Sequence, residues 1–115
     1  MSVQSSLYSG VQSVFSGRLF PIVAPAVVTL PYATYQIVAQ VPQNVLSDTP
    51  NVYATRLQID IFATTASQCE TLKGSVRTAV VTTFGNSAKE NLTFELFEEE
   101  AKIYRVMMDW SVWHN

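Results

Sequence analysis

The stretch Tyr53-Ala-Thr-Arg-Leu-Gln-Ile-Asp-Ile-Phe-Ala63 decides the fold, because apolar and polar residues alternate along it. Alternation with a period of two is typical of an antiparallel strand that buries one of its faces. The residues predicted to face the core are Leu57, Ile59, Ile61 and Ala63. Those predicted to face away from it are Arg56, Gln58, Asp60 and Phe62. The strand therefore supplies one wall of a core and one outward row.

A helix is predicted to follow this strand over residues 67–84. Ser67 and Glu70 have the spacing of a capping box, which predicts that the helix begins at Ser67, and Gly85 favours a left-handed helix end. Close packing is the expected reason for Gly74 inside the helix, where glycine costs ~1 kcal/mol relative to alanine. The predicted apolar stripe consists of Cys69, Leu72, Val76, Ala79, Val80 and Phe84. The residues predicted to turn outward are Glu70, Lys73, Arg77 and Thr78.

The chain before this unit reads as a helix, an uncharged connection and a strand. Apolar residues at helical spacing predict the helix over residues 3–15. In the connection from Leu19 to Leu30, Pro21 and Pro25 interrupt the apolar run, so we expect an extended segment rather than a signal peptide or a membrane span. The strand is predicted over residues 32–42, and the residues expected on one of its faces are Tyr35, Ile37, Ala39 and Val41. The polar residues 43–51 then make a long hairpin with the next strand.

Two further strands are predicted near the C-terminus, over residues 92–98 and 102–113. In the first, Leu92, Phe94 and Leu96 share a face. In the second, the heavy apolar face consists of Tyr104, Val106, Met108, Trp110 and Val112. The predicted order is helix, strand, strand, helix, strand, strand. We therefore expect one α+β domain over residues 1–115, with a mainly antiparallel four-stranded sheet of two hairpins and both helices on one face.

The composition favours a protein that assembles with other proteins. Charged residues make up 14% of the 115 residues and hydrophobic residues 48%, whereas an average chain has about 25% charged residues. A shortage of surface charge suggests that some of the surface is covered by a partner. A monomer whose surface relies on Ser, Thr, Gln and Asn is the alternative.

The sequence offers no catalytic, metal or cofactor motif. His114 is the only histidine and Cys69 the only cysteine, and Cys69 lies on the apolar stripe of the predicted helix. The run Glu98-Glu-Glu100 has too few neighbouring acceptors for a hard cation, which wants six or more oxygens. The seven basic residues are spread singly, without the basic stripe typical of nucleic-acid binding. We expect no enzyme activity, no cofactor and no metal.

Two segments carry a resemblance to a known family. Pro31-Tyr-Ala-Thr-Tyr-Gln-Ile-Val-Ala-Gln-Val-Pro42 and Arg56-Leu-Gln-Ile-Asp-Ile-Phe-Ala63 resemble the two strands of the tail completion, or tail-to-head joining, proteins of long-tailed bacteriophages. The first helix, the proline-rich connection, the central helix and the last strand, ending Asp109-Trp-Ser-Val-Trp-His114, are similar in position to those of that family. The resemblance covers nearly the whole chain, but residues 19–30 do not match the family closely.

This resemblance implies a structural protein of the virion, made in the cytoplasm of the bacterial host and placed at the head-proximal end of the tail. It implies a hexameric ring of identical copies that ends the tail tube and contacts the tail-tube protein and a head-neck connector protein. DNA would pass through the ring without specific binding. Another neck or connector protein, an unrelated oligomeric binding module, and a small enzyme are the alternatives.

The candidate site residues are surface residues rather than catalytic ones. The subunit or tube contacts are expected among the outward row Arg56, Gln58, Asp60 and Phe62 and the hairpin residues Gln43, Asn44, Ser47 and Asp48. Phe62 is the first to test, because it is apolar among polar neighbours. The residues expected to face the DNA channel or the tube rim are Glu98, Glu99 and Glu100, because carboxylates repel phosphates and let DNA slide.

Overall fold

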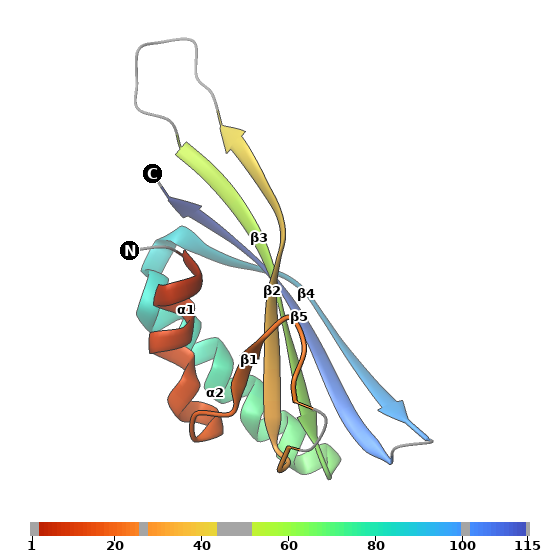
Figure 1. Cartoon of the computed structure of the whole chain (residues 1–115). Coiled ribbons are helices and arrows are strands. Elements are labelled where there is room, and N and C mark those ends of the chain that lie inside the picture. Colours follow the sequence, from red (N-terminus) through yellow and green to blue (C-terminus); the bar gives the residue numbers. More distant parts are fainter. Residues whose placement is uncertain (1–2, 26–27, 44–51, 100–101, 115) are drawn as a thin grey trace.

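The described part of the chain forms two α-helices, two short 3-10 helices and five strands (Figure 1). Our computed structural model describes residues 3–25, 28–43, 52–99 and 102–114. The elements follow one another as α1 (Val3–Val11), the 3-10 helix η1 (Gln12–Phe15), β1 (Leu19–Pro21), β2 (Tyr32–Gln43), β3 (Val52–Ala63), α2 (Ala66–Phe84), the 3-10 helix η2 (Gly85–Ser87), β4 (Ala88–Glu98) and β5 (Ile103–His114). The predicted α+β class and both predicted helices are confirmed.

The sheet has five strands rather than the predicted four, in the order β1-β2-β3-β5-β4. The extra strand, β1, runs parallel to β2, so the sheet is mixed, while every other pair of neighbours is antiparallel. Pairing continues past β1, because the Ile22 N–H donates to the Tyr35 carbonyl at 2.7 Å. A strand of three residues that ends in Pro21 is too short to show alternation, and proline is tolerated there because β1 lies at the sheet edge.

Both helices lie on one face of the sheet (Figure 1), and the core fills the space between the helices and the sheet. The predicted inner row of β3 is confirmed, since all four of its side chains are 0% exposed. β5 adds a second buried row beside it, which consists of Val106, Met108, Trp110 and Val112. The helices contribute Leu7, Val11, Cys69, Val76 and Val80. The neighbouring strands β3 and β5 therefore form the scaffold on which α2 packs.

The N-cap of helix α2 lies two residues before the predicted one at Ser67. Thr65 is the N-cap, and its hydroxyl accepts from the Gln68 N–H at 3.1 Å. The Gln68 side chain in turn accepts from the Thr64 N–H at 3.1 Å, which satisfies a second free donor. Ser67 lies inside the first turn, so the predicted cap there is wrong, although its chemistry is the same. Gly85 ends the helix at φ +61° and ψ −137°, a positive φ that favours glycine, but its ψ differs from the left-handed conformation that was predicted there.

The close packing expected at Gly74 occurs at Gly10 instead. A methyl group added at Gly74 would meet nothing within 4 Å, so that expectation is wrong. A methyl group added at Gly10 would lie 1.9 Å from the Thr83 hydroxyl oxygen on α2. The absence of a side chain at Gly10 is what allows α1 to approach α2.

Each hairpin contains one β-bulge, which reverses the alternation of a strand. In β2 the bulge lies between Ile37 and Ala39, so Ala39 pairs with Arg56 and joins the outward row. The predicted single face from Tyr35 to Val41 is therefore wrong beyond Ile37. An extra residue on one strand shifts every later side chain to the opposite face, and sequence alternation alone does not reveal it.

Candidate assembly surface

The sheet face that carries no helix, here called the open face, holds the outward row predicted on β3. The register pairs Gln58 with Asp109, Asp60 with Met107, and Phe62 with Arg105 of β5. Residues paired across neighbouring strands share a face, so β3 and β5 together build the centre of this surface. Polar residues dominate this central part.

Arg105 is the hub of the first polar cluster on the open face. Its guanidinium forms ion pairs with Asp60 at 3.0 Å and with Glu98 at 3.2 Å. It also lies 5.2 Å from the centre of the Phe62 ring, and that ring stacks on Tyr32 with centroids 4.7 Å apart. Asp60 is only 8% exposed, and its ion pair with Arg105 offsets the cost of burying its carboxylate. Burial, followed by the nearby Glu98 carboxylate, raises the pKa of Tyr32.

The second polar cluster joins β3, β4 and β5. Arg56 forms an ion pair with Asp109 across the two central strands. The Asn91 amide donates to Asp109 at 3.2 Å and to the Ser111 hydroxyl at 2.8 Å. Asn91 lies at the bulge of β4, between Glu90 and Leu92. Its two hydrogen bonds hold the extra residue of the bulge against β5.

The bulge at Asn91 turns an apolar row toward the solvent. Glu90 pairs with Trp110, whose side chain is in the core, whereas Leu92 pairs with Asp109 on the open face. An unbroken register would have placed Leu92 opposite Met108 and therefore inside. The side chains of Leu92, Phe94 and Leu96 are instead 49%, 53% and 48% exposed. We call these three residues the β4 stripe.

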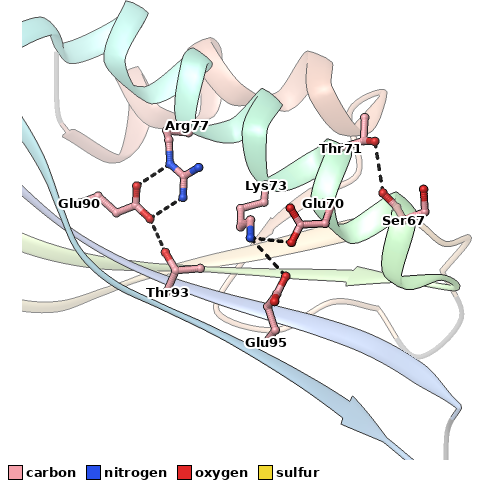
Figure 2. A network of polar contacts seen from close by, with 8 residues as sticks. All are labelled: Ser67, Glu70, Thr71, Lys73, Arg77, Glu90, Thr93 and Glu95. Atoms are coloured by element: carbon pink, nitrogen blue, oxygen red, sulfur yellow. Dashed lines mark hydrogen bonds and ion pairs between the residues drawn. The ribbon is translucent and has the colours of Figure 1, made fainter.

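Three polar residues of β4, Glu90, Thr93 and Glu95, face helix α2 (Figure 2). Arg77 binds Glu90 through two bonds of 2.6 and 2.8 Å, and Thr93 donates to the same carboxylate. Lys73 lies 2.9 Å from Glu70 and 3.3 Å from Glu95. The Arg77 guanidinium holds the pKa of Glu90 below its usual range. Lys73 and Arg77 were predicted to face solvent, but they bind carboxylates of β4 instead. These ion pairs fix which face of β4 lies against the helix.

The structure brings together only part of the predicted site. Arg56, Gln58, Asp60 and Phe62 share the open face, and each contacts a partner within the chain. Glu98 is paired with Arg105, so its charge is partly neutralised, whereas Glu99 is exposed in the turn after β4. Gln43 ends β2. The residues Asn44, Ser47, Asp48 and Glu100 lie outside the described part of the chain.

The β4 stripe is the surface feature that the sequence analysis missed as a site. The alternation along the sequence predicts Leu92, Phe94 and Leu96 on one face, which the structure confirms, but no local pattern indicates that this face is uncovered. The polar residue Asn91 directly before the stripe is the only local sign of the bulge. Its partners, Asp109 and Ser111, lie in another strand and are not visible as partners in the sequence.

The described residues offer few features of a catalytic or membrane-spanning site. Within ranges 3–25, 28–43, 52–99 and 102–114, no three His, Cys, Asp or Glu side chains are placed to hold a metal ion. Neither of the described helices has the length and hydropathy to cross a bilayer. Cys69 is buried as expected, and burial raises the pKa of its thiol. The His114 ring lies 2.6 Å from the Thr55 hydroxyl and stacks on Tyr53.

Comparison with known proteins identifies the family. The family model described as Tail completion protein gp17 matches residues 7–115. The chain belongs to this family. It is a structural protein of a phage, and its place is the tail of the virion. The resemblance of its two central strands to tail completion proteins is thereby confirmed.

A solved structure shares the fold of this tail completion protein. A chain in the virion of a native gene transfer agent particle superimposes with a TM-score of 0.71 at 10% sequence identity. The match covers 96% of this chain and 92% of that one. At so low an identity the likeness concerns the fold alone. Among curated proteins, no sequence matches the chain.

Proposed function

We propose that this tail completion protein ends the tail tube and joins the tail to the head as a six-fold ring of identical copies. Family membership over residues 7–115 supports a role in completing the tail. The observation that carries the ring is the sheet, which ends in β1 on one side and in β4 on the other. Each end strand pairs with one neighbour among the described strands, and a closed ring of copies would cover such edges.

The protein works in this proposal through shape and contact rather than through catalysis. One rim of the ring binds the tail-tube protein, and the other binds a connector protein of the head neck. DNA passes through the opening without specific binding. The polar clusters of the open face support this role, because their charged groups pair with one another and stiffen the strands that carry the contacts.

The contact residues belong to the same proposal. On the open face, the outward row Arg56, Gln58, Asp60 and Phe62 takes part in subunit or tube contacts, and Arg56 is the most exposed of the four. The hairpin residues 43–51 or the acidic turn at Glu98 to Glu100 reach the channel or the tube rim. Glu99 supports this assignment best, since it is exposed and no ion pair with it is seen among the described residues.

Deletion of the gene tests the proposed function directly. Without a protein that ends the tube, we expect filled heads beside free tails of irregular length in electron micrographs of the lysate. Restoring the gene from a plasmid is the control and should return joined virions. Normal infectious particles from the deletion would contradict the proposal, and so would a map of assembled tails that lacks the protein at the head-proximal end. A map with both hairpin tips on the outer circumference would contradict only the assignment of the channel residues.

A further inference from the structure

The β4 stripe has the properties of a contact surface and not of a poorly packed core. Its three apolar side chains are about half exposed, and they lie on the open face only because the bulge at Asn91 reverses the strand. The bulge is held by two hydrogen bonds, and the opposite side of β4 is held by Arg77 and Lys73. Bulges that redirect side chains are often built features of a fold. Here the feature exposes apolar surface, which in soluble proteins marks interaction sites.

A second apolar surface lies at the opposite edge of the sheet. Directly after β1, the side chains of Ile22 and Val23 are 73% and 75% exposed. The Val23 N–H donates to the Pro21 carbonyl at 2.7 Å, which makes a γ-turn with Ile22 at φ +65°. A β-branched residue at positive φ is strained, and such strain persists where the surrounding structure requires it. We call Ile22 and Val23 the β1 patch.

Charge decides what can cover the β4 stripe. An apolar surface that is buried against a charged one leaves that charge without water or a partner, so the covering surface must be uncharged. From Leu19 to Ser47 the sequence contains no Asp, Glu, Lys or Arg. The β1 patch and the neighbouring strand β2 belong to this uncharged stretch. The edge of the same protein therefore supplies the surface that the stripe requires.

We infer that the β4 stripe of one copy binds the β1 patch of the next copy in the ring. This inference rests on the proposed ring and names its interface. The two surfaces differ and lie at opposite edges of one sheet, so each copy offers the stripe to one neighbour and the patch to the other. A contact between unlike surfaces repeats around an axis and forms a ring when the rotation closes, whereas a two-fold contact uses one surface twice.

The neighbouring residues complete a normal interface around this apolar centre. Leu92 pairs in register with Asp109, so the Arg56–Asp109 ion pair borders the stripe as a polar rim. A stable interface buries about 800 Å² on each partner, more than three half-exposed side chains provide. The stripe and the patch are therefore its centre, and the surrounding faces of β4 and β2 supply the rest.

Cysteine cross-linking in assembled tails tests the inference. Cys69 is buried, so the double variant Phe94→Cys/Val23→Cys presents two exposed thiols per copy. After mild oxidation of tails that contain this variant, we expect a ladder of covalent oligomers on a non-reducing gel. The matched control is Val81→Cys/Val23→Cys, because Val81 on α2 is 49% exposed, like the stripe residues, and should give no ladder. Dimers from Phe94→Cys alone would show a two-fold contact and overturn the inference.

A charge rescue gives a second, independent readout in virion assembly. Phe94→Lys places a charge in the apolar centre and should weaken association between copies by about 30-fold or more, the effect of losing one hot-spot residue. Adding Val23→Glu should restore assembly, whereas adding Val81→Glu should not. If the protein is found in tails but shows neither ladder nor rescue, the interface is wrong and the proposed function stands. If the protein is missing from the head-proximal end of wild-type tails, the proposed function itself fails.

Discussion

β3 and β4 each present a row of side chains on the open face, but only the β3 row has partners for its side chains within the described part of the chain. The β3 row is satisfied within the chain, since Asp60 and Phe62 both contact Arg105. The β4 row consists of the apolar β4 stripe, whose side chains are exposed to solvent. The paired residues of the central strand therefore stabilise the monomer in addition to the contacts proposed for them, while the apolar residues of the edge strand are covered only when a partner binds. This difference separates residues whose loss unfolds the protein from residues whose loss prevents assembly.

The largest effects on the free energy of unfolding are expected in the core, which lies below both rows. Trp110 is 2% exposed and is among the largest side chains of the core, so Trp110→Ala should lower the free energy of unfolding by ~3 kcal/mol or more. Chemical denaturation measures this change. Trp110→Phe keeps a ring in the same space and should cost much less. An alanine variant of normal stability that fails to assemble would move Trp110 from the core to an interface.

The β3 row should show the next largest effect. Asp60 is buried and accepts hydrogen bonds from Arg105 and Gln58, so Asp60→Ala should cost about 2 kcal/mol, because two half-buried donors lose their acceptor. The matched control is Arg56→Ala, which removes the exposed ion pair with Asp109 but leaves the Asn91 bonds of the bulge in place, and it should cost clearly less. Equal costs for the two variants, measured by urea denaturation, would remove the distinction between the buried and the exposed pair.

Much of the fold follows from sequence, because local patterns carry it. The inner row of β3 and the stripe of α2 were predicted correctly, since alternation and helical spacing are local properties. The predicted N-cap of α2, Ser67, was wrong by two residues. Thr65 with Gln68 and Ser67 with Glu70 offer the same capping chemistry, so the sequence does not distinguish them. β1 was missed because three residues show no period.

The candidate site was harder to predict, because the face of a strand depends on distant partners. The alternation from Leu92 to Leu96 is the same whether these residues point to the helices or away from them. The bulge at Asn91 decides between the two, and Asn91 is held by Asp109 and Ser111 in another strand. The outer row of β3 was found, but its intramolecular partner Arg105 lies 45 residues from Asp60.

A smaller effect is expected where β4 meets the helix. Glu90→Gln removes the charge that binds Arg77 and should lower the free energy of unfolding by up to about 1 kcal/mol at pH 7. Because the folded pKa of Glu90 is lowered, its contribution is complete above the unfolded pKa and is lost as pH falls through the folded value. The stability difference between wild type and variant should therefore shrink below about pH 4. A difference that is constant from pH 7 to pH 3 would contradict the assigned ion pair.

The smallest effect on stability is expected for Phe94, and its comparison with Phe62 gives the sharpest contrast between the two rows. Phe94 is 53% exposed, so Phe94→Ser should change the free energy of unfolding by no more than about 0.5 kcal/mol. Phe62 stacks on Tyr32 and lies under Arg105, so Phe62→Ser should cost at least about 1 kcal/mol, because both ring contacts are lost. Thermal unfolding of both purified variants measures these costs. In virion assembly the order should reverse, with Phe94→Ser giving free heads and tails although the protein is folded. A normal yield of virions from Phe94→Ser would show that the β4 stripe is not an essential contact, and an unchanged stability of Phe62→Ser combined with failed assembly would make Phe62 the contact instead.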